Sequence, residues 1–191
     1  EMAWFQSQEV LRHLNATEAD AQLYGRLATA VIFGNALRRA APGVIVRNQL
    51  GQPGLWRFGI SGDLPIILLR IGDINRIDLI KQVLQAHAYW RMKGLAADLL
   101  IVNDDFSGYR TILQDRIIGL INAGPEAQII DKPGGVFLRR AEELSGDEWV
   151  LFQTVARIVF TDTTETLVEQ MERRVSAERV SLEELETWAS A

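Results

Sequence analysis

The feature that most constrains the fold is a regular alternation of apolar runs and amphipathic stretches that begins near residue 64. Four runs have the nearly continuous apolar character of strands buried on both faces of a sheet: residues 65–71, 98–102, 135–140 and 157–161. Stretches with apolar residues at helical spacing follow them: residues 75–93, 107–123, 145–155 and 163–174. This alternation predicts an α/β fold, with a mainly parallel sheet of about four strands, right-handed crossovers and helices on both faces.

The sequence ahead of this alternation predicts an N-terminal helical segment and a long, ordered connection. Thr17 and Asp20 have the spacing of a capping box, and Gly34 ends the helix that follows. Residues 35–63 are rich in glycine and proline, and we expect a short strand at 44–46. We therefore expect N-terminal helices and the connection in residues 1–53, the α/β domain in 54–176, and a C-terminal helix leading to a next domain in 177–191.

The composition excludes several classes of function. A net charge of −5 argues against a nucleic-acid-binding protein, which would need a basic face to contact phosphates. The chain has no cysteine, which excludes disulfides, thiolate metal sites and a cysteine nucleophile. No run approaches the roughly 18 apolar residues that span a bilayer, so we expect no direct membrane insertion by this chain.

Acidic residues follow each of the four predicted strands, where a doubly wound sheet places its ligands. They have two interpretations. Carboxylates could hold a divalent cation for glycosyl or phosphoryl transfer, or they could cap the helices that follow. Because helix capping predicts this same composition, we expect no metal site, and the alternative metal ligands are Asp73, Asp104, Asp105 and Asp162.

No other pattern in the sequence predicts catalysis. The glycine-rich loop at residues 59–63 precedes a strand rather than a helix, which argues against a phosphate-binding loop and favours a tight turn. Neither His13 nor His87 has a metal-ligand partner at helical spacing, and His87 is typical of a core histidine. The sequence therefore predicts no cofactor and no catalytic residue in this chain.

One set of motifs resembles a known family. Residues 54–66 read GLWRFGISGDLPI, residues 89–95 read YWRMKGL, and residues 131–138 read DKPGGVFL. In this order they resemble cyclic β-1,2-glucan synthases, and the helix at residues 18–28 fits the same pattern. The resemblance covers most of the chain and is specific, because the GISGDLP string with these companions is not generic.

The resemblance implies a segment of a very large bacterial inner-membrane enzyme. Such enzymes join a membrane-embedded glucosyltransferase, a middle domain and a cellobiose-phosphorylase-like region, formerly classed as a glycosyltransferase family. The segment would lie at the cytoplasmic face, ahead of the phosphorylase-type domains that carry the catalytic residues. Soluble 1,2-β-oligoglucan phosphorylases are related, so the parent protein could be one of those instead.

Two hypotheses of different class follow. The first is a non-catalytic structural or interdomain module, whose partners are other domains of the same polypeptide and whose parent enzyme handles β-1,2-glucan. The second is a small cation-dependent transferase that uses the acidic strand ends. Substrate contacts within the resembling motif would fall on Trp56, Ser61 and Asp63. We expect the segment from Trp56 to Pro65 to be an ordered structural turn, with Trp56 and Phe58 packed against the sheet or the N-terminal helices.

Overall fold

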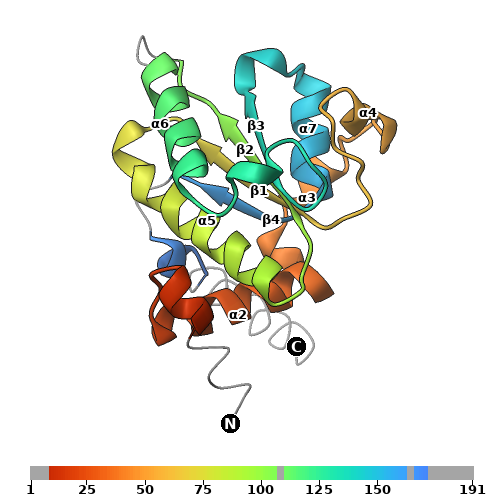
Figure 1. The fold of residues 1–191 in the computed structure, drawn as a ribbon. Helices are drawn as coiled ribbons and strands as arrows, with labels where there is room; N and C mark the ends of the chain where they lie inside the picture. The colour runs from red at the N-terminus through yellow and green to blue at the C-terminus, as the bar shows by residue number, and fades with distance from the viewer. Residues whose placement is uncertain (1–8, 107–109, 163–165, 172–191) are drawn as a thin grey trace, which may run out of the picture.

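The computed structural model describes residues 9–106, 110–162 and 166–171, and its helices surround a single sheet (Figure 1). Residues 9–13 and 167–171 are helical. The remaining elements are, in chain order, α2 (Glu18–Phe33), α3 (Pro42–Ile45), α4 (Pro53–Trp56), β1 (Ile66–Ile71), α5 (Ile77–Met92), β2 (Asp98–Asn103), α6 (Arg110–Ala123), β3 (Val136–Arg140), α7 (Gly146–Val155) and β4 (Ala156–Thr161). Short 3₁₀ turns lie at Ala36–Arg38, Ile74–Arg76, Ala127–Ile129 and Ala141–Glu143.

The sheet confirms the predicted fold class. Its strand order is β3-β2-β1-β4, and all three strand pairs are parallel. The chain moves outward from β1 to β2 and β3, and then returns across the sheet to place β4 on the other side of β1. The strand order therefore reverses between β1 and β4, which is the position where open parallel sheets usually bind ligands.

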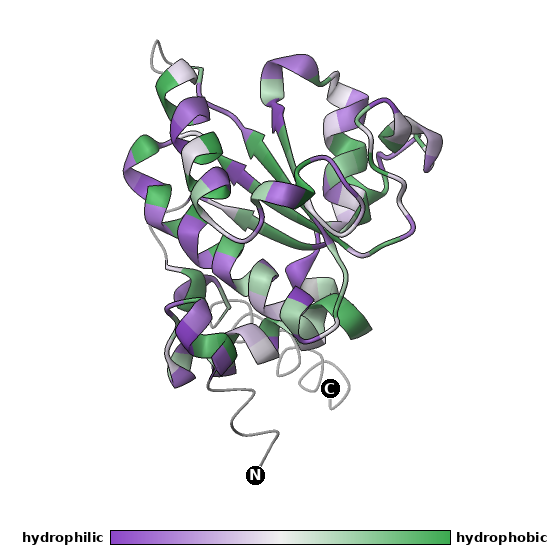
Figure 2. Ribbon diagram, viewed as in Figure 1, coloured by the Kyte–Doolittle hydropathy of each residue, from purple (hydrophilic) through white to green (hydrophobic). Residues whose placement is uncertain are grey.

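Each face of the sheet has its own apolar core, because alternate side chains along a buried strand point to opposite faces. Ile67, Leu69 and Ile71 of β1 face a core shared with α2, α5 and α6. Ile66 and Leu68 face a second core, formed with α7 and the segment around α4. Figures 1 and 2 show these helices on the two sides of strands that are almost wholly hydrophobic.

The N-terminal helix α2 belongs to the first of these cores. The predicted capping box is present, since Thr17 and Asp20 exchange side-chain and backbone hydrogen bonds, and Gly34 ends the helix with φ of 66°. Tyr24 is buried, and its carbonyl oxygen accepts a hydrogen bond of 2.7 Å from the buried Trp90 indole of α5. The α2 helix is therefore tied to the sheet domain by both apolar packing and a buried hydrogen bond.

Two local expectations have different outcomes. The strand expected at residues 44–46 is wrong, because Pro42–Ile45 forms the short helix α3 with Pro42 in its first turn. Proline is well suited to this position, since it supplies a helical φ and its missing N–H has no partner there in any case. Of the helix expected at residues 163–174, the structure describes 166–171, and residues 167–171 are helical. The tail helix expected at 177–191 lies outside the described residues.

Candidate functional site

A hollow of about 490 Å³ lies at the carboxyl end of the sheet, where the strand order reverses. It brings together all four aspartates that the sequence singled out as alternative metal ligands. The lining residues are Arg70, Gly72, Asp73, Asp104, Asp105, Phe106, Thr161 and Asp162. The geometry around each carboxylate shows what these residues do.

Asp162 and Asp73 hold the turn that follows β1. Asp162 Oδ2 accepts the backbone N–H groups of Gly72 and Asp73, at 2.7 and 2.8 Å. Asp73 Oδ1 accepts the N–H of Asn75 at 2.9 Å, and so caps the 3₁₀ turn ahead of α5. Both carboxylates therefore satisfy backbone donors that would otherwise lack a partner at a helix start.

Asp104 and Asp105 hold the turn that follows β2. The guanidinium of Arg70 donates to Asp104 Oδ2, and the same guanidinium lies 5.6 Å from the ring centre of Trp149. Asp105 is buried, and its N–H donates to the Asn103 side chain at 3.1 Å. Within the part of the chain that the structure describes, no group of three or more His, Asp or Glu side chains could hold a metal ion.

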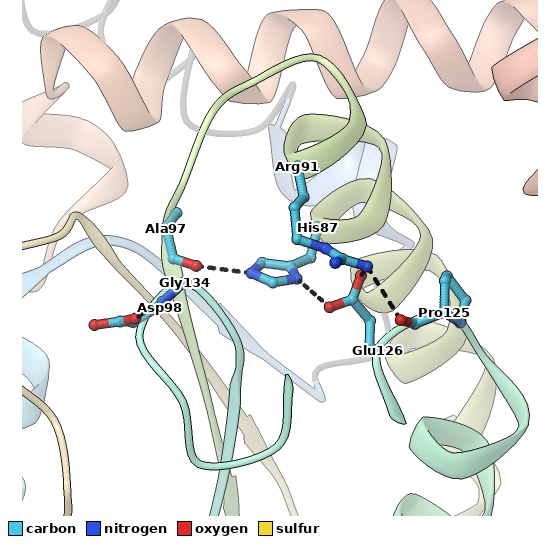
Figure 3. Close-up of polar contacts among 7 residues, drawn as sticks. All are labelled: His87, Arg91, Ala97, Asp98, Pro125, Glu126 and Gly134. Carbon is cyan, nitrogen blue, oxygen red and sulfur yellow. Dashed lines mark hydrogen bonds and ion pairs between the residues drawn. The ribbon is translucent and has the colours of Figure 1, made fainter. Parts of the chain in front are cut away.

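A buried polar network lies at the other end of α5 (Figure 3). The His87 ring has both nitrogens engaged, Nε2 with the carbonyl oxygen of Ala97 at 2.7 Å and Nδ1 with Glu126 Oε2 at 3.2 Å. Arg91 donates to Glu126 Oε1 at 3.3 Å and to the Pro125 carbonyl at 3.1 Å. The Glu126 carboxylate is thus shared between the His87 ring and the Arg91 guanidinium. The structure confirms His87 as a satisfied core histidine.

Asp98, at the start of β2, lies on the other side of the Ala97 carbonyl in Figure 3. The residue is fully buried, and its Oδ1 accepts the N–H of Gly134 at 2.7 Å. Its Oδ2 has no hydrogen-bond partner among the described residues. Burial raises the pKa of Asp98 above its ordinary value, although the Gly134 N–H and the nearby His87 oppose the shift.

The motif turn at residues 52–65 meets the sequence expectation in part. Phe58 is buried and packs edge-on against Phe152 of α7, with ring centres 4.9 Å apart. Trp56, in contrast, is 60% exposed, so its expected packing against the sheet is wrong. The backbone turn is closed by Ser61, whose Oγ accepts the N–H of Asp63, while the Asp63 carboxylate accepts from the Gln52 amide. Trp56 is exposed because α4 is a single helical turn that directs Leu55 into the core and Trp56 outward.

Sequence reasoning missed the polar residues that pair with these groups. Glu126 follows a helix that ends in glycine and proline, and no spacing in the sequence connects it with His87, 39 positions away. Gln52 likewise lies outside every pattern that predicts chemistry. The one available signal was Arg91, which lies inside the YWRMKGL motif.

Together, the fold and these contacts define a parallel α/β domain whose described polar groups chiefly hold the backbone and one another. Within the described residues, no helix is long and apolar enough to cross a membrane.

Comparison with known proteins shows what this domain is similar to. The chain is 29% identical over 188 residues to the cyclic beta-(1,2)-glucan synthase NdvB of Rhizobium meliloti (strain 1021). The similarity covers 98% of this chain and 7% of NdvB, so the chain spans a small part of this relative's length. This match confirms the resemblance to cyclic β-1,2-glucan synthases that the motifs indicated. No protein-family model matches the chain.

Proposed function

We propose that this chain is a non-catalytic structural module of a larger glucan synthase, and that it packs against other domains of the same polypeptide. The observation that carries the proposal is the extent of the similarity to NdvB, which covers 98% of this chain and 7% of the relative. A segment that accounts for so little of a large enzyme can be a complete folding unit without containing the enzyme's reacting groups. We also propose that the module lies next to a phosphorylase-like region, at the cytoplasmic face of an inner membrane. Both of these points rest on the family resemblance alone.

The local geometry supports a structural role. At the carboxyl end of the sheet, Asp73 and Asp162 accept backbone N–H groups, and Asp104 pairs with Arg70. In the buried network, both nitrogens of His87 contact acceptors, so neither is left to exchange a proton with a substrate. These contacts hold the loops of the domain in place, which is a structural role.

Turnover assays test this proposal. We expect the 191-residue chain to leave β-1,2-glucooligosaccharides unchanged in the presence of phosphate, and to transfer no glucose from UDP-glucose with magnesium. The control is the same assay with a complete cyclic β-1,2-glucan synthase. Reproducible turnover by the purified chain, abolished by a point substitution that leaves the fold intact, would refute the non-catalytic role.

A second candidate function is the cation-dependent transferase, which one observation favours: Asp73, Asp104, Asp105 and Asp162 line the same hollow. A cation that occupied this site at 100 times its Kd would stabilise the fold by about 2.7 kcal/mol. We expect magnesium, manganese and calcium to leave the Tm unchanged, since these carboxylates already have protein partners. A rise in Tm that a chelator reverses would favour the transferase instead.

A further inference from the structure

The motif turn exposes the Trp56 ring to solvent, and a hydrogen bond holds the ring in place. Trp56 ends α4, and its indole Nε1 donates to the carbonyl oxygen of Ser61 at 3.4 Å. The same oxygen accepts a hydrogen bond of 2.7 Å from the side-chain amide of Gln52. The indole is thus held at its polar edge while more than half of the residue stays exposed. An exposed tryptophan fixed in this way is a ready contact surface.

A hollow of about 360 Å³ lies at the amino end of the sheet, and it is lined by Gln52, which donates to the same Ser61 oxygen as the Trp56 indole. Gln52, Asp63, Pro65 and Arg157 are among the residues that line it. The Gln52 amide that bonds Ser61 also donates to Asp63 Oδ1 at 3.2 Å, so the hollow and the indole share one hydrogen-bonded group. Asp63 and Arg157, the charged residues that line the hollow, carry opposite charges that balance.

The turn that carries these groups is ordered by contacts within the protein itself. Leu55, Phe58 and Ile60 are buried beneath it and belong to the core on the α7 side of the sheet. The N–H of Gly59 donates to the Trp56 carbonyl at 2.9 Å. Gly59 and Gly62 both have positive φ, 75° and 79°, a conformation that other residues rarely adopt. A ligand that binds here orders little of the protein, which favours affinity.

We propose that Trp56, together with the hollow lined by Gln52, Asp63 and Arg157, is a binding subsite for a neutral oligosaccharide of glucose. The flat indole suits the C–H face of a pyranose ring. A carboxylate, an amide and a guanidinium supply both acceptors and donors for its hydroxyl groups. Balanced charge favours a neutral ligand over an anion or a cation. The identity of the sugar rests on the proposed membership of a glucan synthase, whereas the subsite itself rests on this geometry.

Titration calorimetry with linear β-1,2-glucooligosaccharides and the 191-residue chain tests the subsite. Trp56→Ala is expected to weaken binding by about tenfold or more, which corresponds to about 1.4 kcal/mol. The matched control is Phe106→Ala, which removes a 75% exposed aromatic side chain at the opposite end of the sheet and is expected to leave the affinity unchanged. Arg157→Gln, which removes the positive charge and keeps a shorter polar side chain, is expected to weaken binding as well.

Three results would overturn the subsite: no detectable binding by the wild-type chain at millimolar sugar, wild-type affinity in Trp56→Ala, or an equal loss in Phe106→Ala. Tighter binding of an anionic oligosaccharide of galacturonic acid would overturn the preference for a neutral ligand. Failure of the subsite is distinguishable from failure of the non-catalytic role. Absent binding without turnover refutes the subsite alone, whereas turnover with Trp56-dependent binding refutes the non-catalytic role alone.

Discussion

Removing the carboxylate of Glu126 probes the buried network most directly. Its side chain is 2% exposed and contacts two partners, the His87 ring at 3.2 Å and the Arg91 guanidinium at 3.3 Å. Removing one member of a buried ion pair typically costs about 3–5 kcal/mol, because the remaining charge is left without compensation. The 37% exposure of Arg91 reduces this cost, because solvent screens its charge. We therefore expect Glu126→Ala to lower the free energy of unfolding by about 3 kcal/mol.

The matched variant Glu126→Gln separates the lost charge from the lost volume. Its amide fills the same space, accepts from Arg91 through its oxygen and places its N–H group toward the His87 ring, so we expect a cost of about 1 kcal/mol. Glu142→Ala is the surface control, because Glu142 pairs with Arg140 in solvent and such pairs contribute about 0–1 kcal/mol.

Urea unfolding followed by circular dichroism measures these differences as shifts of the midpoint at constant m value. For a chain of this size, about 3 kcal/mol corresponds to a decrease in Tm of about 6–12 °C. If Glu126→Ala costs no more than Glu142→Ala, the network does not stabilise the fold. If Glu126→Gln costs as much as Glu126→Ala, packing rather than charge explains the effect.

Three further predictions concern single positions elsewhere in the fold. Because burial raises the pKa of Asp98, its protonated form is favoured in the folded state. Stability should therefore fall as pH rises from the ordinary value of 3.8 through the raised folded pKa. Asp98→Asn should abolish this pH dependence when the free energy of unfolding is measured across pH. If the stability of the variant still falls over the same pH range, another group causes the effect. Gly135→Ala should prevent stable folding, since the added Cβ would lie 1.8 Å from the Ile129 carbonyl oxygen. The control is Gly119→Ala in the open middle of α6, which should stabilise the fold by about 0.5–1 kcal/mol. A Gly135→Ala variant that is soluble and unfolds cooperatively would contradict this prediction. Asp63→Ala should cost at most about 1 kcal/mol by urea unfolding, because its bond to Gln52 is exposed, and a larger loss would indicate a hidden partner.

Local contacts explain why so much of the fold could be predicted from sequence. The four strands are short, mostly apolar runs that alternate with amphipathic stretches, and this alternation predicts the parallel α/β class. Thr17 and Ser145 begin helices through capping boxes whose partners lie three residues away. Gly34 ends a helix through its own backbone conformation. Residues 44–46 misled because their β-branched side chains favour a strand, while the neighbouring Pro42 favours a helical turn.

The tertiary structure alone decided which distant groups meet. Strand β4 could have extended the sheet beside β3, and its pairing with β1 depends on how α7 packs across the sheet. His87 and Glu126 are joined because α5 and the loop after α6 pack together, a contact that no sequence spacing encodes. Trp56 is exposed because its neighbours Leu55 and Phe58 take the buried positions of a one-turn helix. Hydrophobic patterning fixes which segments are buried, but the pairing of polar groups across elements depends on packing geometry, which arises only when the whole chain folds.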